Sequence, residues 1–254
     1  MNELTDRAVI AVSGPEAHSY LQGLVTNDVE RAAAGLYAAL LTPQGKILFD
    51  FLISEQDGAI LLDCRHESRE ALVKRLSMYK LRAKVEIAPR DDLGVFVGEG
   101  PADPRLAALG LRSIAPKHEA APGGAAYLAH RLDMGVPEGN DFGSDRMFAL
   151  DADLGELNAV SFDKGCYVGQ ELTARMKHRG TARKRLLAVA TADGSPLVRD
   201  AALTAGGQEI GAVTSAYGAR GFALVRLDRL ATSTGPFQAG GAPVDVIKPS
   251  WLFP

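Results

Sequence analysis

The amino-acid sequence predicts an α+β body followed by a C-terminal β-barrel, on three observations. In the first half of the chain, short apolar runs of strand length alternate with helical patterns. From Lys184 onward, short strands alternate with turns rich in Gly, Pro and Asp, and long helical stretches are missing, which is typical of a small barrel or sandwich. A chain of 254 residues, 46% of them hydrophobic, can bury a substantial core.

The N-terminal part predicts strands covered by two helices. Residues 8–12 are an apolar run of strand length, and apolar side chains at helical spacing follow it. The turn at 42–46 joins two apolar runs into a hairpin, and a third strand follows at 59–64. An amphipathic helix is expected over 67–79, with four side chains facing the core: Ala71, Leu72, Leu76 and Tyr79.

The remaining elements are shorter. In the middle of the chain we expect strands at 83–87, 93–97 and 125–132, a short helix at 104–109, and loops at 115–124 and 135–144. Good helix formers predict a helix over 170–177. The barrel strands are expected at 186–190, 211–215, 222–227 and 244–247, with a long loop at 231–242.

Composition excludes several classes of protein. A net charge of −3 argues against a chain built to coat nucleic acid or an acidic membrane. Two cysteines cannot form a disulfide framework or, by themselves, a four-ligand metal or cluster site, and they fit a reducing compartment. No apolar run reaches the length of a spanning helix, and the first residues lack the pattern of a secretory signal. We therefore expect a cytoplasmic protein without a stably bound metal.

Residues 164–171, Lys-Gly-Cys-Tyr-Val-Gly-Gln-Glu, are the most informative segment. Cys166 stands between glycines, two residues from Lys164 and shortly before the predicted helix, a setting that favours an exposed thiol with a lowered pKa. It is a candidate nucleophile, redox centre or metal–sulfur ligand, and the alternative is an inert buried thiol. For Cys64, which ends an apolar strand, the buried alternative is the favoured one.

Several segments carry a resemblance to a known family. The match around the cysteine extends over residues 160–175, and further matching segments lie in the same order along the chain: 14–17, 21–28, 44–50, 79–85, 135–139 and 211–215. On these residues the chain resembles the YgfZ family of folate-binding, glycine-cleavage T-protein-like iron–sulfur assembly factors. It is most similar to the branch that contains the mitochondrial assembly factor.

The resemblance implies an aminomethyltransferase (T-protein)-like ring of three domains with a folate-sized channel near its centre. We expect a folate-binding domain at 1–90, a middle domain at 91–180 that is interleaved with the first, and the barrel at 181–254. The implied function is that of an accessory protein in iron–sulfur cluster assembly or repair. Cys166 would lie at the mouth of a tetrahydrofolate channel, with Lys164 beside it as the second catalytic residue.

Folate recognition requires hydrogen-bonding groups for the pterin, apolar walls and cations for the glutamate tail. The residues expected to bind tetrahydrofolate or a derivative are Asn27, Asp28, Tyr79, Arg82, Asp133, Tyr167, Gln170, Glu171 and Arg175. A basic cluster near the motif could bind the glutamate tail or an acidic partner, or be a solvated face: Arg175, Lys177, Arg179, Arg183, Lys184 and Arg185.

The implied partners are iron–sulfur scaffold or A-type carrier proteins and client enzymes, and the protein is expected to be a monomer. Two other functions remain open. The chain could be a folate-dependent aminomethyl transferase, although it is short for that enzyme and carries a different loop at the motif. It could also be a protein–protein scaffold with a vestigial folate pocket. Whether it is an enzyme is left undecided by the sequence.

Overall fold

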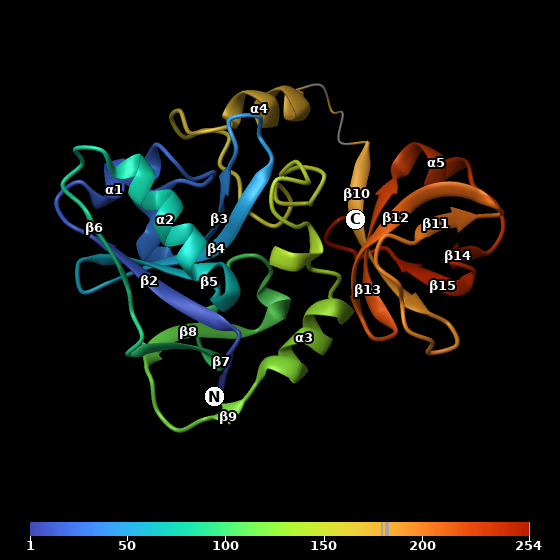
Figure 1. Ribbon diagram of the computed structural model, residues 1–254, viewed down its shortest axis with the longest axis horizontal. Helices are drawn as coiled ribbons and strands as arrows, with labels where there is room; N and C mark the ends of the chain where they lie inside the picture. The colour runs from blue at the N-terminus through green and yellow to red at the C-terminus, as the bar shows by residue number, and fades with distance from the viewer. Residues whose placement is uncertain (179, 181–182, 254) are drawn as a thin grey trace.

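The computed structural model describes residues 1–178, 180 and 183–253, and it consists of two packed sheets, their covering helices and a separate barrel (Figure 1). The predicted α+β class with a C-terminal β-barrel is confirmed. Within the described residues, no helix combines the length and the apolar character needed to cross a membrane.

The larger sheet is antiparallel and has five strands in the order β3-β4-β5-β2-β6. Its strands are β2 (Arg7–Ser13), β3 (Leu36–Leu41), β4 (Ile47–Gln56), β5 (Ala59–Arg65) and β6 (Glu86–Pro89). Helices α1 (Ala17–Gln22) and α2 (Arg69–Lys80) cover one face, and Leu21, Leu72 and Leu76 anchor them in the core there. Of the predicted core positions on α2, Ala71 is exposed instead.

The second sheet packs against the other face of β2 and β5. It comprises β8 (Leu111–Pro116), β7 (Leu93–Ala102), β1 (Asn2–Glu3) and β9 (Ala121–Pro122), and helix α3 (Gly124–Asp133) follows it. Because side chains alternate across a strand, β2 sends Ile10 and Val12 into one core and Val9 and Ala11 into the other. Strand β1 pairs with β7, so the chain start joins a sheet of the middle segment.

One predicted strand, at 125–132, is wrong, because this segment forms helix α3. The buried side chains Tyr127, Arg131 and Leu132 share one face at helical spacing, and three alanines favour the helix. The predicted helix at 104–109 is reduced to one 3-10 turn, Ala107–Leu109, and the expected loop after it contains part of β8.

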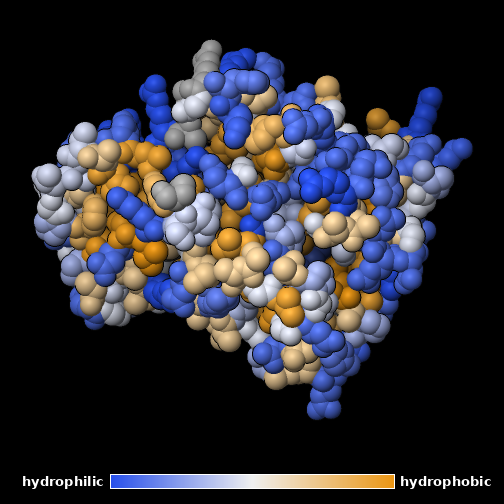
Figure 2. Space-filling model, turned by 180° about the vertical axis from the view of Figure 1, so that it is seen from behind, coloured by the Kyte–Doolittle hydropathy of each residue, from blue (hydrophilic) through white to orange (hydrophobic). Residues whose placement is uncertain are grey.

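The barrel is closed, with strand order β10-β13-β12-β11-β14-β15. Its strands are β10 (Lys184–Thr191), β11 (Ala202–Ala205), β12 (Gln208–Tyr217), β13 (Arg220–Arg226), β14 (Phe237–Ala239) and β15 (Ala242–Ile247). Strands β11 and β14 and helix α5 (Leu227–Thr232) were not expected from the sequence. Apolar side chains also gather on the outside of the barrel, which lies on the left in Figure 2, and Val198 is 64% exposed.

A network of buried hydrogen bonds connects the two sheets and their helices, here called the body, to the barrel. Asp141, at the end of the 3-10 turn Gly139–Asp141, accepts hydrogen bonds from Arg131, Ser215 and Tyr217 at 2.6, 2.6 and 2.9 Å. The Trp251 indole donates to the Met134 carbonyl over 2.8 Å at the same junction. The predicted domain limits at residues 90 and 180 stay a prediction.

Candidate functional site

Residues 161–169, here called the cysteine loop, lead into α4 (Gln170–His178) and are fixed to the turn after α1. The Lys164 ammonium donates to the carbonyl oxygens of Val25 and Asn27 over 2.8 and 2.6 Å. Burial lowers the pKa of Lys164 to about 8, and Asp28 opposes this shift. The Lys164 ammonium thus holds the loop in place through both hydrogen bonds. That Lys164 also lowers the pKa of the Cys166 thiol stays a prediction.

The turn that receives Lys164 is itself held by side chains. Thr26 donates from its hydroxyl to the Ala159 carbonyl over 2.6 Å, and its own carbonyl accepts from the Ser161 amide over 3.0 Å. The Asn27 amide group donates to the carbonyls of Tyr37 and Asn158 over 2.8 and 2.7 Å. Asn27 is therefore a structural bridge between β3 and the segment before the cysteine loop.

The end of the loop rests on the β3–β4 hairpin. Gly169 has a φ of +83°, and a Cβ at this position would overlap the Thr42 carbonyl oxygen. Gly45, in the hairpin turn, has a φ of +80° and would place a Cβ 3.2 Å from the Gly169 carbonyl oxygen. Both positions therefore require glycine, because the two backbones approach closely at left-handed angles.

Between these two anchors, Tyr167 is buried and Cys166 is exposed. The Tyr167 backbone amide donates to the Gln170 side-chain oxygen over 3.2 Å, and the Lys164 ammonium lies 5.3 Å from the centre of the Tyr167 ring. The prediction that Cys166 is exposed is confirmed. Cys64, by contrast, is fully buried, and burial raises the pKa of its thiol to about 12.

We expect an alkylating reagent near pH 7.5 to label Cys166 and to leave Cys64 unmodified in the native protein. Attack requires an accessible thiolate, and Cys64 lacks both access and ionisation. Peptide mass spectrometry after a time course of labelling measures both sites, and denatured protein, in which both cysteines should react, is the control. Modification of Cys64 first would contradict the expectation.

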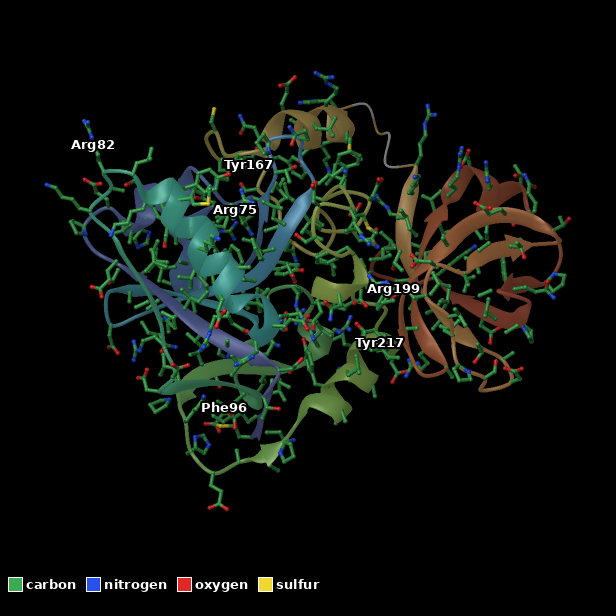
Figure 3. The ribbon with its side chains drawn as sticks, in the orientation of Figure 1. Arg75, Arg82, Phe96, Tyr167, Arg199 and Tyr217 are labelled. Carbon is green, nitrogen blue, oxygen red and sulfur yellow. The ribbon has the colours of Figure 1, made fainter. Side chains whose placement is uncertain are left out.

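The nine residues that were predicted to bind folate lie in three separate places in the structure. Six lie at or next to the cysteine loop: Asn27, Asp28, Tyr167, Gln170, Glu171 and Arg175. Tyr79 and Arg82 lie at the end of α2, where Arg82 points away from the body (Figure 3). Asp133 ends α3 and pairs with Arg220 of the barrel over 2.5 Å. None of the nine lines any of the four cavities that are described below.

Two cavities have Arg65 in common among the residues that line them. The larger measures about 250 Å³ and is lined by Tyr127, Tyr217, Arg131 and Glu138, among others. The smaller, of about 110 Å³, includes Asp50 in its lining. The sequence analysis missed these residues as a site, because charged residues in a sequence look like surface positions until the fold buries them.

Buried ion pairs set the charges in these cavities. Glu138 accepts from Arg105 over 2.8 Å and lies 3.6 Å from Arg131 and from Arg65. Burial opposes its ionisation, but Arg131 and Arg105 outweigh this and hold the Glu138 pKa well below its usual range. Burial raises the pKa of Asp50, with Arg7 opposing. A cavity that contains a carboxyl group with a raised pKa beside fixed cations is a typical ligand or proton-transfer site.

Two members of the predicted basic cluster pair with carboxylates of the chain itself. Arg175 pairs with Glu171 on the outer side of α4 over 2.7 Å, and Arg185 pairs with Glu156 over 2.6 Å. Lys177 lies 4.9 Å from the centre of the Phe162 ring and lines a cavity of about 530 Å³ next to α4. Arg179 lies outside the described residues. Among the described residues, no group of three or more His, Cys, Asp or Glu could hold a metal ion.

The chain matches known proteins over nearly its whole length. The human protein named iron-sulfur cluster assembly factor IBA57, mitochondrial, is 35% identical, and the match covers 89% of this chain and 77% of that protein. The mouse protein of the same name is 32% identical, with coverages of 98% and 84%. The chain belongs to the IBA57 family. The resemblance to YgfZ-like, mitochondrial-type assembly factors is thereby confirmed.

Two further comparisons agree with this family. The family model described as CAF17, C-terminal beta-barrel domain, matches residues 183–254, a range that contains all six barrel strands. The crystal structure of the glycine cleavage system aminomethyltransferase T from Bartonella henselae superimposes with a TM-score of 0.72 at 16% identity, covering 98% of this chain and 85% of that one. At this identity the likeness shows the fold, so the expected aminomethyltransferase-like architecture is confirmed.

The expected cytoplasmic location is contradicted by the IBA57 relatives, whose names place the human, mouse and Pyricularia oryzae proteins in mitochondria. The expectation depended in part on cysteine usage. That observation fits a reducing compartment, but it does not distinguish one reducing compartment from another.

Proposed function

We propose that this protein is an accessory factor in iron–sulfur cluster assembly and that Cys166 is its reactive group. The observation that supports this most is the construction of the cysteine loop. Lys164 fixes one end to the turn after α1, Gly169 fits the other end onto the β3–β4 hairpin, and the thiol between them is exposed. A thiol held at a defined place on the surface suits transient contact with a cluster or a partner's cysteine.

The partners that fit this role are an iron–sulfur scaffold or A-type carrier protein and the client enzymes that receive clusters. The names of the family members, as cluster assembly factors, support this class of partner. An exposed thiol can engage a partner without opening the fold, because the residues that hold the loop are separate from the sulfur.

Cells in which Cys166→Ala replaces the wild-type protein should lose most iron–sulfur enzyme activity while the protein accumulates normally. The exposed sulfur contributes little buried area, so its removal should leave stability nearly unchanged. Cys64→Ala is the matched control: it removes a buried sulfur, costs on the order of 1 kcal/mol of stability and keeps activity. Full enzyme activity in Cys166→Ala cells would overturn the proposed role of the thiol.

We further propose that the two cavities at Arg65 hold a reduced folate, tetrahydrofolate or a derivative. Their lining supplies aromatic walls in Tyr127 and Tyr217 and cations in Arg65 and Arg131. The Arg131 Nε atom is buried without a hydrogen-bond partner among the described residues, so a ligand acceptor would satisfy it. A bound tetrahydrofolate would supply a reduced pterin that carries one-carbon units, next to the Asp50 carboxyl group.

Arg65→Met should weaken tetrahydrofolate binding by roughly ten- to a hundredfold, since a buried charge-assisted hydrogen bond contributes roughly 1.5–3 kcal/mol. Arg175→Ala is the comparison variant, because Arg175 is 52% exposed in its side chain and pairs with Glu171 outside both cavities. Titration calorimetry measures both constants. Loss of binding in Arg175→Ala alone would place the folate at the cysteine loop instead. Release of formaldehyde or ammonia that depends on tetrahydrofolate would identify a transferase.

A further inference from the structure

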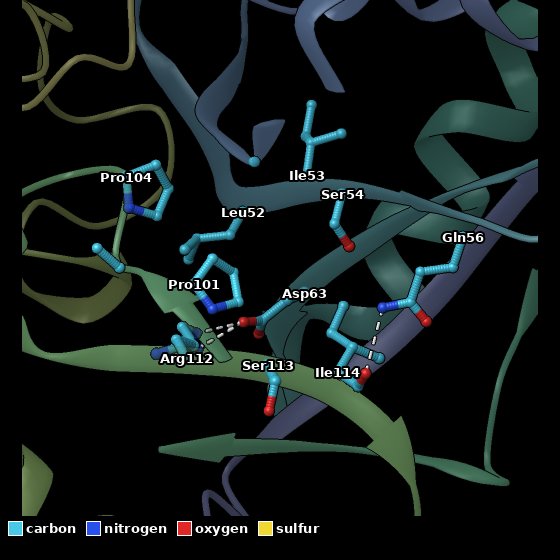
Figure 4. Close-up of a pocket in the computed structure, with 12 residues that line it drawn as sticks. Leu52, Ile53, Ser54, Gln56, Asp63, Pro101, Pro104, Arg112, Ser113 and Ile114 are labelled. Atoms are coloured by element: carbon cyan, nitrogen blue, oxygen red, sulfur yellow. Dashed lines mark hydrogen bonds and ion pairs between the residues drawn. The ribbon is translucent and has the colours of Figure 1, made fainter. Parts of the chain in front are cut away.

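A fourth cavity, separate from Arg65 and from the cysteine loop, lies between β4 and the β7–β8 pair (Figure 4). It measures about 110 Å³. Its walls are mostly apolar, with Leu52 on β4, Pro101 at the end of β7 and Ile114 on β8. The Gln56 amide closes one side by donating to the Ile114 carbonyl over 3.2 Å. Most of the lining thus comes from strands of the two sheets, and Gly35 and Pro104 add to it from connecting segments.

Unsatisfied polar atoms gather in this lining. Among the described residues, buried side-chain atoms without a hydrogen-bond partner include the hydroxyls of Ser54 and Ser113 and two nitrogens of Arg112, and all three residues line the cavity. Arg112 Nη2 lies 2.6 Å from Asp63 Oδ2 and is paired electrostatically, so Nη1 is the donor that is left over. Arg112 is only 6% exposed, and a buried donor without an acceptor is costly.

The charge around the cavity favours an anion with a single charge. Asp63 is shared by two arginines: its carboxylate accepts from Arg7 and from Arg112, each over 2.7 Å. Glu138 and Asp50 also act on Arg7 electrostatically, so the donor that remains for a further anion at this cavity is Arg112 Nη1. Asp103, next to the lining residue Ala102, is bound to Arg105 and would repel a second negative charge on the ligand.

We propose that this cavity binds a small aliphatic monocarboxylate, with its carboxylate on Arg112 and its alkyl part against Leu52 and Pro101. An apolar cavity of about 150 Å³ accommodates benzene, so 110 Å³ suffices for about five non-hydrogen atoms, the size of propionate. The Ser54 hydroxyl supplies a second donor. A ligand this small should bind with a dissociation constant on the order of 1 mM.

The test is titration calorimetry of the full chain with formate, acetate, propionate and butyrate against sodium chloride of equal ionic strength. We expect saturable 1:1 binding that is strongest near propionate, and propionamide, which has the same shape without the charge, should bind at least tenfold more weakly. Ser54→Ala should weaken propionate about threefold through the lost hydrogen bond.

A variant that narrows the entrance assigns the signal to this cavity. Ala102 is exposed and part of the lining, so Ala102→Leu should abolish propionate binding while leaving the melting temperature nearly unchanged. Two results would overturn the proposal: no saturable carboxylate binding to the wild type, meaning that the cavity holds water only, or undiminished binding to Ala102→Leu. Neither result depends on Cys166 or on folate. Failure of this proposal would therefore leave the proposed function in cluster assembly untouched.

Discussion

Asp141→Ala should lower the free energy of unfolding by about 3–5 kcal/mol, the cost of leaving a buried charge without its partner. Asp141 is fully buried and accepts from Arg131, Ser215 and Tyr217. It also accepts from the Glu138 amide over 2.9 Å. Without the carboxylate, Arg131 keeps its charge in the interior and loses the acceptor that lies 2.6 Å away.

The loss should open the junction between body and barrel before the rest of the fold. Trp251, the single tryptophan of the chain, donates to the Met134 carbonyl at that junction, so its fluorescence reports on the contact. In Asp141→Ala the fluorescence transition in urea should move to a lower concentration than the transition followed by circular dichroism. Coincident transitions would mean that body and barrel still unfold as one unit.

Asp133→Ala is the matched control, because Asp133 also pairs across the junction but in solvent. The Asp133 side chain is 59% exposed, and exposed ion pairs contribute about 0–1 kcal/mol. A loss of stability equal to that of Asp141→Ala would show that burial does not explain the difference. Because the control should fold normally, it also allows the predicted role of Asp133 in folate binding to be measured without a stability effect.

The sequence predicts the architecture well where side-chain periodicity is clear and poorly where it is not. Four strands of the five-stranded sheet could be predicted because apolar runs are separated by turn residues, whereas the strand expected at 83–87 forms at Glu86–Pro89 instead. Helix α3 was missed because an arginine is not expected among core residues, so the buried face shared by Tyr127, Arg131 and Leu132 could not be recognised in the sequence. Short strands such as β14 depend on their barrel neighbours, which lie far away in sequence.

For the candidate site as well, local features could be predicted from the sequence and long-range contacts could not. The exposure of Cys166 could be predicted locally, because glycine and charge surround it. The role of Lys164 in holding the loop could not, because its acceptors belong to Val25 and Asn27, which come close only in the folded chain. Likewise, Glu138 and Arg105 carry no sequence signal of burial, since each is buried only by virtue of the other charges around it.

Gly169→Ala should abolish function although the thiol remains. An alanine at a φ of +83° costs about 1–3 kcal/mol of backbone strain, and its Cβ would overlap the Thr42 carbonyl oxygen, so the cysteine loop must leave the hairpin. Cells carrying this variant should show iron–sulfur enzyme activities as low as those with Cys166→Ala. Cys166 should still be alkylated at least as fast as in the wild type, because the displaced loop is no less exposed.

Gly165→Ala provides the control within the same loop. Gly165 does not adopt a left-handed angle, and a Cβ there would have no heavy atom within 4 Å, so this variant should keep both activity and stability. If Gly169→Ala cells kept full activity, the position of the thiol would be irrelevant and only its presence would matter. If both variants lost activity alike, the loop would be sensitive to any added side chain, and the loss in Gly169→Ala would not report on the contact with the hairpin. Loss in Gly169→Ala alone, with a reactive Cys166, would show that the function requires the sulfur at one defined place relative to the β3–β4 hairpin.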